Sequence, residues 1–146
     1  MMKRFFLTLM MVVTCTLAAF SQNAAADRIC GTYLAKLSKN DAKVKVFQYN
    51  GGYRLQVIWL KETKNEDGSL KVDSKNPNAS KRKTPLSQVV LVDKVTYEDG
   101  IWQNGEIYDP QSGKTYKTEL RLNGKDLEVR GKLGPFHKSM HWTKID

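Results

Sequence analysis

Alternation of apolar and polar residues over short stretches is the feature that most restricts how this chain can fold. In residues 116–122 charged residues alternate with Tyr, Thr, Leu and Leu, so that the charged side chains share one face, and residues 127–133 alternate in the same way. Period-two alternation turns one face of a strand toward a core and the other toward water, as antiparallel sheets require. Asn123-Gly124 between the two stretches favours a tight hairpin turn.

Similar strand signals recur along the chain, separated by clusters of Gly, Asn, Asp and Pro, and no stretch after the first 26 residues shows sustained helical periodicity. The predicted strands cover residues 28–34, 44–49, 53–59, 86–97, 102–108, 116–122, 127–133 and 139–144. We therefore predict an all-β fold, a single antiparallel up-and-down β-barrel of about eight strands, because such a meander can close and abolish its edges. A barrel of this size is either filled by side chains or holds one small ligand.

The start of the chain has the pattern of a secretory signal peptide. Lys3 and Arg4 precede an apolar run over residues 5–20, which is shorter than a comfortable membrane span, and small residues follow it. A retained membrane anchor and a lipid attachment at Cys15 are less favoured alternatives, since the residue before Cys15 fits lipid attachment poorly. The pattern predicts export, to the periplasm or the medium.

Two cleavage positions fit the small-x-small rule, one after Ser21 and one after Ala26. We divide the chain into a signal peptide over residues 1–26 and a β-barrel domain over residues 27–146. Cys30 is the one cysteine that remains after the leader. An internal disulfide is therefore not expected, and a buried apolar cysteine is the favoured interpretation.

The net charge of the chain limits its partners. The formal charge is +9, and it falls to +7 without the leader, which contains two basic residues and no acid. A basic exported domain favours anionic partners such as lipid head groups, and export makes nucleic acid an unexpected partner. Positive charge gathers at Lys81, Arg82 and Lys83 in a long polar stretch, Glu62–Pro85, that is either an anion-contacting flap or a solvated loop.

Aromatic residues in the predicted strands are candidates for lining a ligand pocket. If the interior is open, these side chains would surround an apolar ligand and the three basic residues would take its charge at the mouth. Simple filling of the core is the alternative. The candidate ligand-binding residues are Tyr33, Trp59, Trp102, Tyr108, Tyr116, Lys81, Arg82 and Lys83.

Residues for catalysis or metal binding do not form a recognisable set. The sequence has no G-x-S-x-G motif, and Cys30 has no obvious histidine partner. His137 and His141 would face the same way on a strand, but a zinc site needs further ligands that the nearby sequence does not offer. We expect no catalytic residue, no metal and no cofactor, and an enzyme is not the favoured class.

One motif resembles a known family. Residues 102–116 read Trp102-x-x-Gly105-x-Ile107-Tyr108-Asp109-Pro110-x-x-Gly113-x-x-Tyr116, and shorter pieces at 57–60, 127–134 and 142–144 match in order. Together they are similar to a family of small exported bacterial proteins catalogued as domain of unknown function number twenty-one forty-seven. The resemblance implies a calycin-like, lipocalin-resembling β-barrel in the cell envelope and implies no catalytic residues. Tyr33 stands where the family usually has tryptophan.

These observations lead to two functional hypotheses. The first is an exported envelope barrel that binds a lipid or another small, partly apolar or anionic ligand, with peripheral contact to the envelope. The alternative is a non-enzymatic interaction or scaffold module whose barrel is filled and whose outer surface binds its partner.

Overall fold

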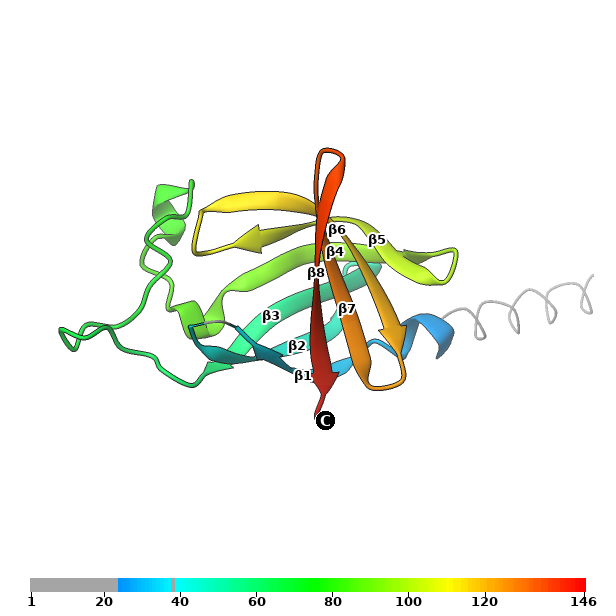
Figure 1. Cartoon of the computed structure of the whole chain (residues 1–146), viewed down its shortest axis with the longest axis horizontal. Helices are drawn as coiled ribbons and strands as arrows, with labels where there is room; N and C mark the ends of the chain where they lie inside the picture. Colours follow the sequence, from blue (N-terminus) through cyan, green and yellow to red (C-terminus); the bar gives the residue numbers. More distant parts are fainter. Residues whose placement is uncertain (1–23, 38) are drawn as a thin grey trace, which may run out of the picture.

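The alternating stretches form eight antiparallel strands in the computed structural model, which describes residues 24–37 and 39–146 (Figure 1). Each strand pairs with the next along the chain and the last pairs with the first, so the sheet closes into a barrel. The strands are β1 (Gly31–Lys36), β2 (Asp41–Tyr49), β3 (Gly52–Leu60), β4 (Val90–Glu98), β5 (Ile101–Asp109), β6 (Lys114–Asn123), β7 (Asp126–Leu133) and β8 (Phe136–Lys144). The predicted up-and-down barrel is confirmed.

Two of the hairpin turns follow directly from their sequence. Asn50 and Gly51 join β2 to β3 with φ of 45° and 76°, and Asp99 and Gly100 join β4 to β5 with φ of 54° and 80°. Two consecutive residues of positive φ form the turn that matches the right-handed twist of the flanking strands. Asn, Asp and Gly adopt this conformation at low cost, so these dipeptides fix the pairing of both hairpins.

The largest differences from the predicted elements lie where two strands begin. The strand expected from residue 86 starts at Val90, after a short 3-10 helix, η2 (Leu86–Gln88), whose preceding proline favours a helical turn. A second 3-10 helix, η1 (Ala79–Lys81), lies in the connection between β3 and β4. Residues 24–27 are helical, and the first strand begins at Gly31 rather than at residue 28.

Residues 1–23 of the predicted leader lie outside the described residues. In the described part of the chain, no helix has the length and apolar character needed to cross a membrane.

β-Bulges change the face to which some side chains turn. Trp102 and Ile107 are both buried in the core, although residues an odd number apart face opposite sides of a regular strand. The register of β5 against β6 shifts between Trp102 and Gly105, and Asn104 takes a φ of 65°. A Cβ atom at Gly105 would lie 2.3 Å from the carbonyl oxygen of Lys94, so glycine is needed where β5 bends toward β4.

One end of the barrel is plugged by the helical turn before β1, which Figure 1 shows beside the turn between β4 and β5. Ala26 and Ile29 are buried and belong to the core cluster. The indole N–H of Trp102 donates to the Ala26 carbonyl at 3.1 Å, and the hydroxyl of Tyr33 donates to the Ile29 carbonyl at 2.8 Å. Buried Trp and Tyr need such acceptors, and the plug supplies them. Burial raises the pKa of Tyr33 to about 12.

Asp27 fastens the same plug to the rim of the barrel. Its carboxylate accepts hydrogen bonds from the Tyr53 hydroxyl and from the Gln48 amide. Both hydrogen bonds lower the pKa of Asp27, and the bond from Tyr53 has the larger effect. Burial, reinforced by Asp27, raises the pKa of Tyr53. The plug is therefore held by apolar packing and by five side-chain hydrogen bonds, the fifth from the Lys144 ammonium group to the Arg28 carbonyl.

The seam that closes the barrel is short. In the described residues, β1 and β8 pair at Tyr33–Lys144 and Leu34–Thr143, close to the plugged end, and Thr32 exchanges backbone hydrogen bonds with the two residues that follow β8. The hairpin of β7 and β8 continues for six more residue pairs beyond Leu127–Trp142, to Leu133–Phe136. In Figure 1 the tip of this hairpin stands clear of the other strands. The barrel therefore closes at one end and splays at the other, which we call the mouth.

We expect Trp102→Phe to lower the free energy of unfolding by about 1–3 kcal/mol, because the buried Ala26 carbonyl loses its donor. The matched substitution Trp59→Phe, on an exposed side chain, should change the stability by less than about 0.5 kcal/mol. Urea unfolding followed by circular dichroism measures both. Equal unfolding midpoints for the two variants would contradict the role assigned to the indole.

Candidate functional site

The aromatic residues predicted to line a pocket do not lie together. Tyr33 and Trp102 are 0% and 1% exposed and fill the plugged end of the barrel. Tyr116 packs against the core at the other end, opposite Ile107 on β5. The buried side chains of the plugged end thus correspond to the core-filling alternative, and the core cluster continues through Ala35, Ala42 and Leu60 toward the other end.

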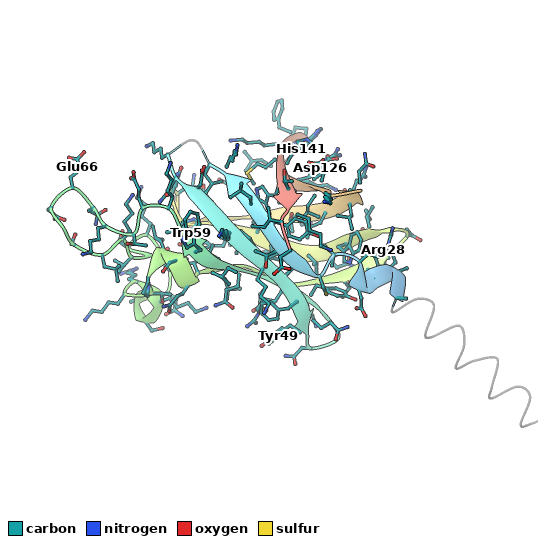
Figure 2. All side chains as sticks on the ribbon, turned by 90° about the horizontal axis from the view of Figure 1, so that it is seen from below. Arg28, Tyr49, Trp59, Glu66, Asp126 and His141 are labelled. Carbon is teal, nitrogen blue, oxygen red and sulfur yellow. The ribbon has the colours of Figure 1, made fainter. Side chains whose placement is uncertain are left out.

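Trp59 lies on the outer wall of the barrel, and Figure 2 shows it on the outward face of β3. A register shift next to Lys43 pairs Trp59 with Lys43 and Val57 with Val44. Val57 is buried, whereas Trp59 is 39% exposed and the ammonium group of Lys43 lies 4.8 Å from its ring centroid. The bulge has turned this tryptophan away from the interior, where strict alternation had placed it.

Tyr108 lies on the face of β5 opposite to Ile107 and anchors the long connection between β3 and β4. Its hydroxyl donates to the carboxylate of Asp73 at 2.6 Å, and the Asn76 side chain donates to the same carboxylate at 2.8 Å. Asp73 is 2% exposed although its side chain is polar. Burial, reinforced by Asp73, raises the pKa of Tyr108. The connection is therefore latched to the barrel wall.

The three basic residues of this connection are exposed and lie away from Tyr33 and Trp102. The Arg82 guanidinium donates to the Asn76 carbonyl at 2.7 Å and so supports the shape of the loop itself. Lys81 ends η1, and Lys83 follows two residues later. Figure 2 shows the connection extending to Glu66, far from the plug at Arg28. The structure thus separates the predicted cations from the predicted aromatic residues.

The mouth is bordered by residues that sequence reasoning did not single out. Residues opposite one another in an antiparallel pair face the same side, and the pair Leu127–Trp142 faces the core. By alternation, the pairs Val129–Met140, Gly131–Lys138 and Leu133–Phe136 face the same way. We call the five members of these pairs beyond Val129 the inner row: Gly131, Leu133, Phe136, Lys138 and Met140.

Gly131 leaves space at the mouth. A Cβ atom built on it would lie 3.8 Å from the Cβ of Tyr116 and 3.9 Å from a methyl group of Ile107, which are ordinary contact distances. A larger side chain here would occupy the volume between β7 and these two residues. Further along the inner row, Leu133 and Phe136 are 60% and 74% exposed. Apart from Lys138 the inner row is thus apolar, and its side chains near the hairpin tip are exposed. Gly131 is its smallest residue.

One cation interrupts this apolar surface. Lys138 makes no ion pair in the described part of the chain, whereas the outward-facing Lys132 and Arg130 pair with Glu119 and Glu128. Residues 129–140 contain no Asp or Glu. A sequence signal was present, since Leu133 and Phe136 flank the turn residues Gly134-Pro135, where polar residues are more common.

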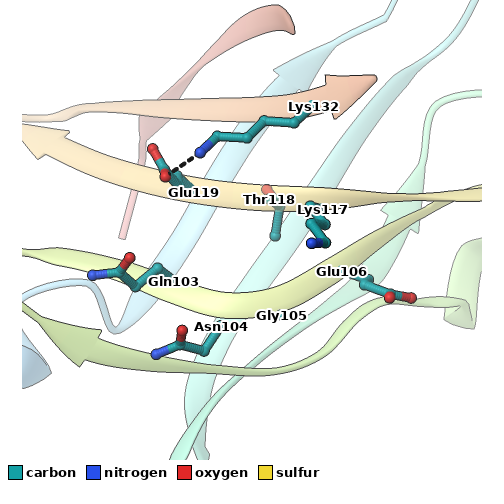
Figure 3. Close-up of a pocket in the computed structure, with 8 residues that line it drawn as sticks. All are labelled: Gln103, Asn104, Gly105, Glu106, Lys117, Thr118, Glu119 and Lys132. Atoms are coloured by element: carbon teal, nitrogen blue, oxygen red, sulfur yellow. Dashed lines mark hydrogen bonds and ion pairs between the residues drawn. The ribbon is translucent and has the colours of Figure 1, made fainter. Parts of the chain in front are cut away.

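The two best-formed hollows of the described structure lie on the outer wall. The first, of about 320 Å³, opens at the β5 bulge, where Figure 3 shows Glu119 joined to Lys132. The hydrogen bond from Lys132 lowers the pKa of Glu119, so the principal charges of this hollow already satisfy each other. The second, of about 500 Å³, is a shallow depression beside Cys30, and burial raises the pKa of this thiol. A raised pKa makes the thiol a weak nucleophile.

The histidines do not converge on a shared partner. His141 lies 2.8 Å from a carboxylate oxygen of Asp126, and His137 pairs across the strands with Lys132. Among the described residues, no group of three or more His, Cys, Asp or Glu side chains is close enough to hold a metal ion. The hydrogen bond that the His141 ring donates to the Asp126 carboxylate raises the pKa of His141.

The family profile described as "Uncharacterized protein conserved in bacteria (DUF2147)" matches residues 31–144. The chain belongs to the DUF2147 family. A solved structure described as "Protein HP1028 from the human pathogen Helicobacter pylori belongs to the lipocalin family" is similar, with 26% identity and a TM-score of 0.65 over 81% of this chain and 83% of its own. The comparison with curated proteins found no match. The family resemblance and the lipocalin-like barrel are confirmed.

The DUF2147 match extends over every strand of the barrel, from β1 to β8. It includes the latched connection and the inner row, whereas the plug residues 24–30 precede it. The family motif that carries the resemblance contains Gly105 and Tyr108, one at the bulge and one at the latch. In this DUF2147 protein the motif residues thus shape the wall of the barrel.

We expect Tyr108→Phe to loosen the latched connection, because buried Asp73 loses one of its two side-chain donors. The unfolding free energy should fall by about 1–3 kcal/mol and limited proteolysis should cut residues 61–89 faster. Tyr116→Phe removes a hydroxyl from an inward-facing tyrosine and is the matched control. If the Tyr108 hydroxyl holds the connection, the protease should cut the Tyr116→Phe control at the wild-type rate.

We expect the ion pair of His141 to make stability depend on pH. Because the folded-state pKa is raised above 6.5, this contribution is fully present below about pH 6.5 and is lost as the pH rises through the folded-state value. An NMR titration should give a His141 pKa above 6.5 in the wild type and a lower one in Asp126→Asn. His137, measured in the same spectra, should not respond to that substitution.

Proposed function

We propose that this protein is a non-enzymatic binding protein of the cell envelope that takes a small, partly apolar, anionic ligand at the mouth of its barrel. The apolar part of the ligand lies against the inner row beside Tyr116, and Lys138 binds the anionic group. The observation that carries this proposal is the pairing of exposed, inward-facing apolar side chains with a single cation that has no ion-pair partner in the described residues. Few convergent polar groups on an apolar concave surface are typical of ligand sites.

Three further observations support the proposal. The protein from Helicobacter pylori that resembles this one is described as a member of the lipocalin family. The leader pattern predicts export. The core cluster fills the barrel, which limits a ligand to the exposed inner row of the β7–β8 hairpin and favours a short or partly protruding molecule.

The alternative function, an interaction module, is favoured by a different surface. On the outer wall of β2 and β3, Lys43 stacks on Trp59, and the Arg54 guanidinium lies 3.4 Å from the ring centroid of Tyr49. Exposed aromatic and cationic side chains of this kind are common in interfaces. Because these cations already contact the aromatic rings of their own chain, we give this surface second place.

A fluorescent fatty acid, such as cis-parinaric acid, tests the proposed site. We expect the wild-type protein to bind it and Gly131→Leu to weaken binding at least tenfold, equivalent to about 1.4 kcal/mol, by filling the space beside Tyr116. Gly131→Ala adds one methyl group at an ordinary contact distance and is the matched control, with near wild-type affinity.

The charge is tested separately. Lys138→Gln should weaken binding of the fatty acid and leave binding of the corresponding alcohol unchanged, whereas Lys45→Gln on the outer wall should affect neither. If the wild-type protein binds neither probe, or if Gly131→Leu binds as the wild type does, the site is not at the mouth and the interaction module becomes the favoured function.

A further inference from the structure

We propose that the tip of the β7–β8 hairpin, residues 132–138, docks on the surface of an anionic phospholipid bilayer, with Leu133 and Phe136 inserted between the head groups. This surface shares Leu133, Phe136 and Lys138 with the proposed ligand site, but it requires only that the tip is exposed and not that a ligand is bound. The proposal rests on the shape, the apolar character and the charge of the tip.

The shape of the tip frees it from the barrel. Pairing with β1 stops at Leu34–Thr143, while pairing with β7 continues to Leu133–Phe136. Gly134, with a φ of 59°, and Pro135 turn the chain at the end of this hairpin. Figure 1 shows the tip projecting beyond the other strands, so it can reach a flat surface that the barrel wall cannot.

The apolar side chains of the tip are the most exposed of the large hydrophobic residues in the described structure. Phe136 is 74% exposed and Leu133 is 60% exposed, whereas Ile58, Leu70 and Ile145 are 47–48% exposed. The two tip residues are direct cross-strand neighbours, so they form one apolar point. Water contact at such a point is unfavourable, and insertion into the boundary of head groups and acyl chains removes it.

The positive charge of the tip favours an anionic surface. Arg130, Lys132 and Lys138 lie within residues 129–140, and because Arg130 pairs with Glu128 and Lys132 with Glu119, Lys138 is the one of the three without an ion pair in the described residues. Lys132 and Lys138 stand close behind the apolar point, each one or two residues from it along its strand. Basic residues beside an inserted apolar group are attracted to anionic lipid head groups, and the two contributions together give binding that neither gives alone.

A bilayer fits this tip better than a protein partner does. Stable protein interfaces bury roughly 1,000 Å² or more, which requires a broad complementary face. The two apolar side chains at the end of this two-stranded hairpin form a small contact area and not a broad face. Insertion into a fluid surface needs no complementary shape, so we assign the tip to lipid rather than to a second copy of the chain.

Co-sedimentation with vesicles tests this proposal. The protein is used in processed form, with its first residue established by mass spectrometry, so that the apolar leader does not contribute. Vesicles of phosphatidylcholine mixed with phosphatidylglycerol are compared with vesicles of phosphatidylcholine alone. We expect binding to the mixed vesicles, weaker binding to the neutral ones, and a decrease as salt screens the basic residues.

The variants separate the tip from the rest of the surface. Leu133→Ser combined with Phe136→Ser should lower the vesicle partition coefficient at least tenfold, and Lys138→Glu should lower it for the anionic vesicles. Ile58→Ser combined with Leu70→Ser removes two exposed apolar side chains elsewhere and should bind as the wild type does. Gly131→Leu, which fills the ligand site, should also bind vesicles normally, so failure of the ligand site and failure of the membrane contact are distinguishable.

A spectroscopic measurement reports insertion directly. Phe136→Trp should gain an emission component that shifts to shorter wavelength when anionic vesicles are added, and Ile58→Trp should gain one that does not shift. The proposal is overturned if the wild type does not bind anionic vesicles or if the tip double variant binds as well as the wild type. A dimer in sedimentation velocity that the same double variant dissociates would assign the tip to a second copy instead.

Discussion

The short seam between β1 and β8 is the constraint from which the rest of the structure follows. An eight-strand meander has two free edges, and joining them is what turns the sheet into a barrel. Here the edges meet at two residue pairs near Tyr33 and then diverge. Because β8 leaves β1 beyond Leu34–Thr143, the inner row of the β7–β8 hairpin stays exposed although the core cluster fills the barrel.

The plugged end of the barrel depends on large side chains that each carry one polar atom. Trp102 and Tyr33 fill the space between the strands and still require acceptors for an indole N–H and a hydroxyl. Backbone carbonyls of Ala26 and Ile29 meet that requirement, so residues before the first strand become part of the core. At the other end, Gly131 takes the position that a bulky side chain could have filled.

Alternation predicted the strand order and most of the strand positions, because each strand has one buried and one wet face. The side of the wall was predicted incorrectly for Trp59 and Tyr108, since a bulge adds one residue and exchanges the two faces beyond it. The alternation of apolar and polar residues does not reveal the extra residue of a bulge, although a glycine inside a strand, such as Gly105, can indicate one. The inner row escaped notice because Leu133 and Phe136 look like core residues until the seam is known to stop short.

The carbonyl of Ala26 also bears on how the chain would be matured. Peptide-bond cleavage after Ala26 would convert this acceptor into a leaving carboxylate on the discarded fragment and place a charged α-amino group on Asp27, beside the apolar core. Cleavage after Ser21 would leave the acceptor, the helical turn and the Asp27 contacts in one piece. Removal of the predicted leader together with Ala26 would thus leave a barrel whose plugged end lacks part of its core.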